Sequence, residues 1–371
     1  MKPNNNQNVR VIAFYLPQFH PTPENDRWWG KGFTEWTNVG KAKPLFKGHY
    51  QPRVPADLGY YDLRLPETRQ AQADMAREYG IEGFCYWHYW FGNGKQLLQR
   101  PFNEVLNSGK PDFPFCLAWA NHSWEDKQFN KDGGHKMLME QLYPGDEDYI
   151  AHFNAVLPAF QDPRYIRIHG NPIFVVYSPK EIPNPPHFIE LWQKLASQHG
   201  FRIHFVGHTS KIEDLALFRQ WGFDANVLIR LFDVFKKDFS LWERINAKLQ
   251  RIALKKGRRI EYSRASQYFQ GPEEQANDCY PTLIPNWDHS PRSGRSGHIL
   301  INSTPEKFKK HIIKSFNNIS HKTREDRIVF LKSWNEWAEG NYMEPDLKFG
   351  RGYLEALKDA IQDVFYLLKD K

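Results

Sequence analysis

Short apolar runs alternate with longer amphipathic segments along almost the whole chain of 371 residues. Eight runs have the length and apolar continuity of parallel strands that are buried on both faces. These runs are residues 9–17, 81–87, 115–120, 172–177, 203–207, 224–229, 280–286 and 328–334. Helical patterns lie between or after them, at residues 66–79, 146–160, 186–199, 211–221, 305–317 and 351–368. Eight strand–helix units predict an α/β fold, a single (β/α)8 TIM barrel that forms one catalytic domain over residues 1–371.

Two long insertions interrupt this alternation, at about residues 19–65 and about residues 232–278. Long ordered segments in a compact domain usually carry function or small helices of their own. The first insertion contains three tryptophans, Glu35 and several glycines, a composition typical of a lid or of the wall of a binding site. Packing of these tryptophans into a loop core is the alternative. The second insertion contains a candidate basic helix at residues 241–254.

Aromatic and polar side chains follow six of the eight predicted strands at the point where each strand ends. In a barrel the carboxyl ends of all strands meet at one rim, where active sites are built. We therefore expect these side chains, with others from the first insertion and the last strand, to gather around one substrate. The expected substrate contacts are Tyr15, His20, Trp28, Trp29, Glu35, Trp36, Trp87, His88, Tyr89, Trp90, Asn121, His122, Trp124, Trp287, His289, Trp334, Asn335, Trp337 and Glu344.

Two carboxylic acids, Glu336 and Glu339, follow the last predicted strand and are flanked by Trp334 and Trp337. They are three positions apart, so one helical turn would place their Cβ atoms roughly 5–6 Å from each other on the same side. Paired carboxyl groups suit the cleavage or transfer of a glycosidic bond, because one protonates the departing oxygen while the other assists at the sugar. Glu336 and Glu339 are therefore the predicted catalytic residues. A solvated turn without chemistry is the alternative.

Composition and charge indicate only broad classes of binding partner. The chain has 13 Trp, 17 Tyr and 27 Phe, and aromatic faces stack on the apolar faces of sugar rings. The net charge of +7 favours anionic partners without selecting among them. The densest basic run, residues 255–259, is not accompanied by a nucleic-acid-binding motif, so no nucleic-acid partner is expected.

A metal centre has weak support in the sequence. His88, His122, His208 and His289 could converge at the rim, but the chain has no His-Glu-x-x-His motif and no zinc-type cysteine spacing among its three cysteines. We expect no metal and no cofactor, and a metal-dependent hydrolase stays an alternative. No Gly-x-Ser-x-Gly elbow or phosphate-binding glycine loop is visible either.

The N-terminus is polar, and no run of 18 or more apolar residues could form a transmembrane segment. The expected location is therefore the cytoplasm, with peripheral contact at a membrane surface left open.

Five motifs resemble those of the WbsX-like family: residues 13–20, 32–39, 83–91, 119–122 and 334–339. The resemblance runs from about residue 9 to the C-terminus. That family is usually described as glycosyltransferases of bacterial surface polysaccharide loci. It is similar to glycoside hydrolase family 99, whose endo-α-mannosidases and endo-mannanases have a TIM-barrel fold. The resemblance implies an oligosaccharide or polysaccharide substrate, α-glycosidic bonds, and a role in surface polysaccharide or O-antigen (lipopolysaccharide) metabolism.

The resemblance also implies roles for the two acids. In those mannosidases the first acid of this segment assists the 2-hydroxyl of the substrate as internal nucleophile, and the second is the general acid/base of a retaining reaction. Carried onto this chain, Glu336 would be the base and Glu339 the acid/base. Ala338 stands where the mannosidase motif commonly has a more polar residue. Direct attack by a carboxylate, a nucleotide-sugar-dependent glycosyltransferase and a non-catalytic glycan-binding barrel remain alternatives.

Overall fold

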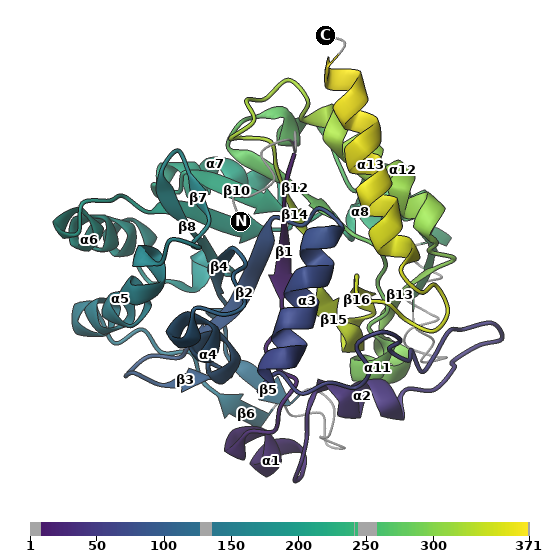
Figure 1. The fold of residues 1–371 in the computed structure, drawn as a ribbon, viewed down its shortest axis with the longest axis horizontal. Coiled ribbons are helices and arrows are strands. Elements are labelled where there is room, and N and C mark those ends of the chain that lie inside the picture. Colours follow the sequence, from purple (N-terminus) through teal and green to yellow (C-terminus); the bar gives the residue numbers. More distant parts are fainter. Residues whose placement is uncertain (1–8, 127–135, 241, 244–257, 370–371) are drawn as a thin grey trace.

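Eight parallel strands close into a barrel in the computed structural model, which describes residues 9–126, 136–240, 242–243 and 258–369 (Figure 1). Their order is β1-β14-β12-β10-β9-β8-β4-β2, and pairing of β2 with β1 completes the ring. The barrel strands are β1 (Arg10–Tyr15), β2 (Gly83–Trp90), β4 (Phe115–Trp119), β8 (Asn171–Val176), β9 (His204–Thr209), β10 (Ala225–Leu228), β12 (Cys279–Leu283) and β14 (Ile328–Leu331). All eight predicted strands and the (β/α)8 fold class are confirmed.

Burial on both faces explains why these strands read as continuous apolar runs. In β2 all eight residues are buried, and in β14 all four. Ile12 pairs with Gly83 on one side and with Phe330 on the other, so β1 is an interior strand of the ring. A side chain at Gly83 would collide with the carbonyl group of Pro114, which requires glycine at the start of β2.

Six helices match the predicted helical segments, with small shifts at their ends. They are α3 (Pro66–Glu78), α5 (Asp146–Gln161), α6 (Pro185–Gln198), α7 (Glu213–Gln220), α12 (Pro305–Asn318) and α13 (Gly352–Lys369). Figure 1 shows them arranged around the strands, with α5 and α6 on one side of the barrel and α12 and α13 on the other. One further helix, α4 (Arg100–Ser108), was not expected from the sequence because it is short and buries only Pro101, Phe102 and Val105.

The first insertion forms α1 (Pro23–Trp29) and α2 (Glu35–Lys41), which lie at the lower end of the barrel in Figure 1. The described part of the second insertion contains α8 (Asp233–Lys237), β11 (Arg258–Glu261), α10 (Tyr262–Ala265), η2 (Ser266–Tyr268) and η3 (Pro272–Gln275). The candidate basic helix at 241–254 lies outside the described residues, apart from 242–243. Smaller elements complete the loops: β3 (Gln96–Leu97), β5 (Trp124–Asp126), β6 (Lys136–Met139), β7 (Arg167–Ile168), η1 (Pro179–Glu181), α11 (Ser290–Ser293), η4 (Gly294–Ser296), β13 (His298–Ile301), β15 (Asn335–Glu336), η5 (Trp337–Glu339) and β16 (Asn341–Tyr342).

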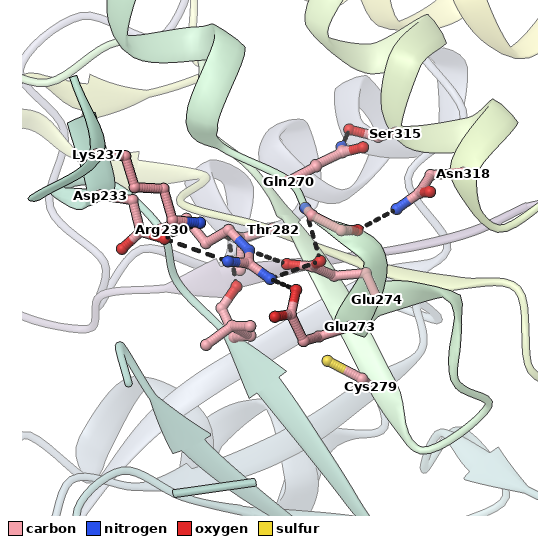
Figure 2. Close-up of polar contacts among 12 residues, drawn as sticks. Arg230, Asp233, Lys237, Gln270, Glu273, Glu274, Cys279, Thr282, Ser315 and Asn318 are labelled. Carbon is pink, nitrogen blue, oxygen red and sulfur yellow. Dashed lines mark hydrogen bonds and ion pairs between the residues drawn. The ribbon is translucent and has the colours of Figure 1, made fainter. Parts of the chain in front are cut away.

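A buried ion cluster around Arg230 ties the second insertion to the barrel (Figure 2). Arg230 follows β10, and its side chain is fully buried. Its guanidinium donates hydrogen bonds to Glu273 and Glu274 of η3 and, over 3.2 Å, to Asp233 of α8. Asp233 also pairs with Lys237 over 3.3 Å, whereas Glu274 is fully buried against Arg230, so the position of η3 in particular depends on Arg230.

None of the described helices is both long enough and apolar enough to cross a membrane. Cys85, Cys116 and Cys279 are free thiols buried among apolar side chains, as the sequence predicted for the first two.

Candidate active site

A cleft of about 1490 Å³ opens at the carboxyl ends of the barrel strands. Every strand contributes to its lining at its last residues or just beyond them. The eight contributions, in chain order of the strands, are Leu16, Trp87, Ala120, Tyr177, His208, Ile229, Trp287 and Lys332. The cleft therefore occupies the rim at which (β/α)8 enzymes build their active sites.

Glu336 and Glu339 both line this cleft, and a short hairpin presents them. Glu336 ends β15, which pairs antiparallel with β16, and Glu339 ends the 3-10 turn η5 between the two strands. Gly340 then takes a left-handed conformation, with φ of 58°, which a residue with a side chain adopts less readily. The predicted helical turn is thus a tighter 3-10 turn.

Arg292 of α11 holds three carboxylates together at the floor of the cleft. Its Nε and Nη2 atoms each lie 2.9 Å from Oε1 of Glu35, and its Nη1 atom donates to Oε1 of Glu339. Its Nη2 atom is also 3.8 Å from Oε2 of Glu336. Arg292 was not among the predicted site residues, because the Ser-Pro-Arg-Ser turn that carries it matches no motif.

The environment separates the pKa values of the two glutamates. Burial, and then the negative charge of Glu339, raise the pKa of Glu336 to about 7, against the opposing charge of Arg292. Burial alone would raise the pKa of Glu339 as well, but the charge of Arg292 and the nearby His289 lower it well below its ordinary value. Below about pH 7 the pair therefore holds mainly one protonated and one ionised carboxyl group. The pKa values thus favour Glu336 as the acid and Glu339 as the ionised group. The family resemblance implies the reverse roles.

Further contacts fix the orientation of each acid. Trp87 Nε1 donates a hydrogen bond of 3.0 Å to Oε1 of Glu336. His289 Nε2 lies 3.7 Å from Oε1 of Glu339. Trp87 itself is held by stacking on Phe14, with ring centroids 4.7 Å apart and planes nearly parallel. The indole that orients Glu336 is therefore itself held in place by ring packing.

Eight of the predicted substrate contacts line the cleft together with the acids. They are Trp29, Glu35, Trp87, Tyr89, His122, Trp124, Trp287 and His289. They come from the first insertion and from the ends of β2, β4 and β12, so residues far apart in the sequence meet around one space.

Eleven predicted contacts lie outside the lining of the cleft, and we leave them out of the proposed substrate site. These are Tyr15, His20, Trp28, Trp36, His88, Trp90, Asn121, Trp334, Asn335, Trp337 and Glu344. The alternation of side chains along a strand explains two of them. Trp87 and Tyr89 point into the cleft, whereas His88 and Trp90 point outward and contact His152 of α5.

Several of the others form the layer beneath the site. Glu344 accepts hydrogen bonds from Tyr61 Oη (2.9 Å), Gln72 Nε2 (2.6 Å) and Trp337 Nε1 (2.6 Å). Asn335 bonds both the amide nitrogen and the carbonyl oxygen of Leu16. These contacts fix the hairpin that carries Glu336 and Glu339 against the end of β1. Glu344 and Asn335 therefore support the site from below.

Tyr15, His20, Trp28, Asn121 and Trp334 do not line the cleft themselves, although Trp28 and Asn121 contact lining residues. Tyr15 Oη donates to Gln72 of α3, over 2.7 Å. Asn121 bonds Ser178 and Tyr143. Trp334 packs on Phe84 in the core, Trp28 packs on Trp124, and His20 is buried near Asp62.

The four histidines considered as metal ligands do not converge. His88 contacts His152 on the outside of the barrel, and His289 contacts Glu339. His122 and His208 each pack against Tyr177, with ring centroids 5.1 and 4.6 Å from it. Within the described residues, no group of three or more His, Cys, Asp or Glu side chains could hold a metal ion.

Solved structures share this architecture. The endo-α-mannosidase of glycoside hydrolase family 99 from Bacteroides thetaiotaomicron, in complex with bis-tris propane, aligns with a TM-score of 0.60 at 14% identity over 99% of both chains. A structure described as a glycoside hydrolase-like protein aligns with a TM-score of 0.57 at 14% identity, over 97% of this chain and 95% of the other. At these identities the likeness shows the fold.

Sequence comparison identifies the family. A protein named WxcX from Xanthomonas campestris pv. campestris is 35% identical over 356 residues, which are 95% of this chain and 49% of that protein. The chain spans about half the length of the curated relatives it matches. Residues 11–357 match the profile described as glycosyltransferase WbsX. The chain therefore belongs to the WbsX glycosyltransferase family, as its motifs predicted.

Proposed function

We propose that this protein is a carbohydrate-active enzyme that breaks or re-forms a glycosidic bond, with Glu336 as the proton donor and Glu339 as the ionised carboxylate. The observation that carries the proposal is the pair of carboxyl groups at the strand ends, one with a raised and one with a lowered pKa. Two neighbouring titratable groups with separated pKa values are the usual arrangement of an acid and a base or nucleophile.

The chemistry follows from these protonation states. Glu336 donates its proton to the glycosidic oxygen as the bond to the anomeric carbon breaks. Glu339 then attacks that carbon, or removes the proton of a neighbouring sugar hydroxyl that attacks in its place. In the second half of the reaction, ionised Glu336 takes a proton from the incoming water or sugar hydroxyl, whose oxygen bonds to the anomeric carbon. The bond that breaks is the one from that carbon to Glu339 or the one to the neighbouring sugar oxygen, which then takes its proton back from Glu339. Water gives hydrolysis, whereas a sugar hydroxyl gives transfer.

The surroundings of the pair support a glycan as the substrate. Trp29, Trp87, Trp124 and Trp287 line the cleft, and indole faces bind the apolar faces of sugar rings. A cleft of about 1490 Å³ is larger than the pockets that hold single small molecules, so it can hold several sugar units. The names of the aligned structures make an α-mannosidic bond the first linkage to test. The usual description of the WbsX-like family makes bacterial surface polysaccharide metabolism the proposed setting.

Transfer from a nucleotide-sugar is the second candidate function, because the family is described as glycosyltransferases. It differs from the first candidate in the leaving group, which would be a nucleoside diphosphate. The raised pKa of Glu336 favours the first candidate, because an alkoxide leaving group needs a proton and a diphosphate leaving group does not.

The test compares the wild-type protein with Glu336→Gln and Glu339→Gln. Each is incubated with α-linked mannose oligosaccharides, with bacterial polysaccharides and with a panel of nucleotide-sugars, and the products are identified by mass spectrometry. We expect cleavage or transglycosylation by the wild type and none by either variant, while both variants still bind the glycan. The matched control is Glu355→Gln, an exposed glutamate of α13, which should keep wild-type activity.

Two outcomes would contradict the proposal. Turnover that persists in both glutamine variants would show that the acids are not catalytic. Product formation from nucleotide-sugars alone would replace the first candidate with the second.

A further inference from the structure

Lys332 is a buried cation beside the acid pair. It follows β14 and lines the cleft, and its residue is 8% exposed. Its Nζ atom lies 5.7 Å from the ring centroid of Trp87, 5.7 Å from that of Trp287 and 5.8 Å from that of Phe14. Among the residues that the structure describes, none forms a hydrogen bond or an ion pair with this ammonium group. Three aromatic rings therefore surround a charge that has no protein acceptor.

Aromatic rings stabilise such a charge only in part. A cation–π contact contributes on the order of 0.5–2 kcal/mol, and it leaves the three N–H donors of an ammonium group available. Buried polar groups in proteins normally have hydrogen-bond partners, so a buried donor set that faces a cleft indicates a ligand with acceptor atoms. Lys332 has the donors, and the cleft gives a ligand access to it.

Two neighbours of Lys332 also carry buried polar atoms without a hydrogen-bond partner in the described part of the chain: Trp287 Nε1 and His208 Nε2. Trp287 can only donate. His208 is neutral, because burial and then the charge of Lys332 lower its pKa to about 3. Since the His208 ring donates its N–H to backbone oxygens, its unpartnered Nε2 is an acceptor, and Trp287 Nε1 is the unpartnered donor of the two.

The charges of Lys332 and Arg292 both lower the pKa values of Glu336 and Glu339, but of these two cations only Arg292 also forms ion pairs with acids of the cleft. Arg292 is engaged by Glu35 and Glu339, whereas Lys332 forms no ion pair within 4 Å with any described carboxylate. Six lysine or arginine and six acidic side chains line the cleft, so protonation of Glu336 leaves a net positive lining. An additional negative charge from a ligand is thus tolerated, and Lys332 is the group placed to receive it.

We propose that Lys332 forms a subsite for a carboxylate carried by a sugar, so that the substrate is an acidic glycan containing a uronic acid or a similar carboxylated unit. The inference rests on the proposed function of the cleft. A carboxylate only accepts hydrogen bonds, which matches an ammonium group that only donates. The cleft gives such a carboxylate access to Nζ of Lys332.

The experiment measures glycan binding to the full chain carrying Glu336→Gln, which prevents turnover. The probes are matched pairs of oligosaccharides: uronic-acid-containing glycans and the same glycans after reduction of each carboxylate to a hydroxymethyl group. A second set carries phosphate esters. Dissociation constants are compared for the parent, for Lys332→Met, which removes the charge and keeps most of the length of the side chain, and for Lys332→Arg. Lys309→Met, a change at a partly exposed residue of α12 outside the cleft lining, controls for net charge.

We expect the parent to bind the carboxylated member of at least one pair about tenfold more tightly than its reduced partner. Lys332→Met should lose this preference and keep its affinity for the reduced glycan. Lys332→Arg and Lys309→Met should retain the preference. If Lys332→Met does not fold, the salt dependence of the parent decides, because only affinity for the carboxylated member should fall as salt rises.

The outcomes separate the two proposals. Equal binding of both members of every pair would overturn the carboxylate subsite and leave the proposed function intact. A preference for phosphate esters over carboxylates, or a preference that survives in Lys332→Met, would also overturn the subsite. If the parent binds no glycan of either kind, the proposed function fails and the subsite fails with it.

Discussion

Arg292 and Glu35 are joined by two contacts of 2.9 Å, from Nε and Nη2 of the guanidinium to the same carboxylate oxygen. Glu35 begins α2 in the first insertion, and Arg292 lies on α11 beyond β12, so the pair bridges two loops across the cleft. Because Glu35 occupies one edge of the guanidinium, Nη1 is left to contact Glu339. The first insertion thereby sets the position of the cation that keeps Glu339 ionised.

Replacement of Arg292 by methionine should therefore disable the acid pair without removing either acid. The pKa of Glu339 should rise once the positive charge is lost, and the two glutamates would then compete for one proton. We expect kcat to fall by roughly 10²–10³-fold, the usual scale for loss of one preorganised electrostatic contact. The fall in kcat is measured by steady-state kinetics on a glycan that the wild type cleaves.

Two variants control for this effect. Arg292→Lys keeps the charge but cannot contact both carboxylates in the same way, so its activity should lie between those of the wild type and Arg292→Met. Glu35→Gln should slow the reaction less than Arg292→Met, because the cation remains beside Glu339. Equal activity of Arg292→Met and the wild type would show that Arg292 does not govern the pair.

The pH dependence of kcat/KM should identify which glutamate is the acid. If Glu336 must be protonated, activity is highest below its pKa of about 7 and falls as the pH rises through that value. Glu339, with its lowered pKa, stays ionised across this range and adds no second limb there. The two values belong to the interacting pair, so Glu339→Gln, although inactive, should lower the pKa of Glu336 by removing a neighbouring negative charge, which an NMR titration of the Glu336 carboxyl group would detect.

Activity that instead rises with pH through about 7 would mean that Glu336 acts as the base. That result would restore the roles implied by the family resemblance. The profile should be recorded between pH 4 and 9 with substrates that have poor leaving groups, for which proton donation limits the rate. An activated aryl glycoside serves as the comparison, because its cleavage should depend far less on protonated Glu336.

The fold was predictable because burial on both faces of the barrel leaves a strong sequence signal. All eight apolar runs became strands, and the rim position of Glu336 and Glu339 followed from the order of those strands. It was harder to predict which side chains of a strand point into the cleft and which point toward the helices. Trp87 and His88 are neighbours in one aromatic run, yet one faces the cleft and the other faces α5. When both faces are buried, residue type alone does not distinguish them.

Arg292 could not be found by the same reasoning. It contacts Glu35, Glu336 and Glu339, which lie 257, 44 and 47 positions away in the sequence. Its own segment is a four-residue helix without a chemical motif. Lys332 was visible in the sequence as the residue before Ser333, but its importance comes from the rings of Phe14, Trp87 and Trp287 around it. Long-range pairings of this kind depend on the closed ring of strands, and local patterns do not encode them.

Glu344 should be a structural residue, and Glu344→Gln should lower the free energy of unfolding by about 1–3 kcal/mol, the cost of leaving a buried donor without an acceptor. Gln72 Nε2 donates to one oxygen of Glu344, and Trp337 Nε1 donates to the other. In either orientation, the amide nitrogen of glutamine would face one of these donors. Urea unfolding at several pH values measures the loss.

The effect should depend on pH in a defined direction. Burial raises the pKa of Glu344 from 4.5 to about 7. The stability that this group contributes by binding its proton in the folded state is fully present below pH 4.5 and is lost as the pH rises through about 7. The difference between Glu344→Gln and the wild type should therefore be larger at pH 5 than at pH 8. A difference that grows with pH would contradict the raised pKa.

Arg230→Met should be more damaging to the fold than any of the changes at the cleft. The substitution leaves Glu274, which is fully buried, beside Glu273 and Asp233 without their shared cation. Removal of one partner from a buried ion cluster typically costs about 3–5 kcal/mol, and urea unfolding measures the loss. Arg77→Met, which breaks an exposed ion pair with Asp74, should cost about 1 kcal/mol or less. Adding Glu274→Met to Arg230→Met should recover part of the lost free energy of unfolding, because one uncompensated buried charge is then removed. Equal stability of the single and double variants would show that repulsion among these acids is not the cause.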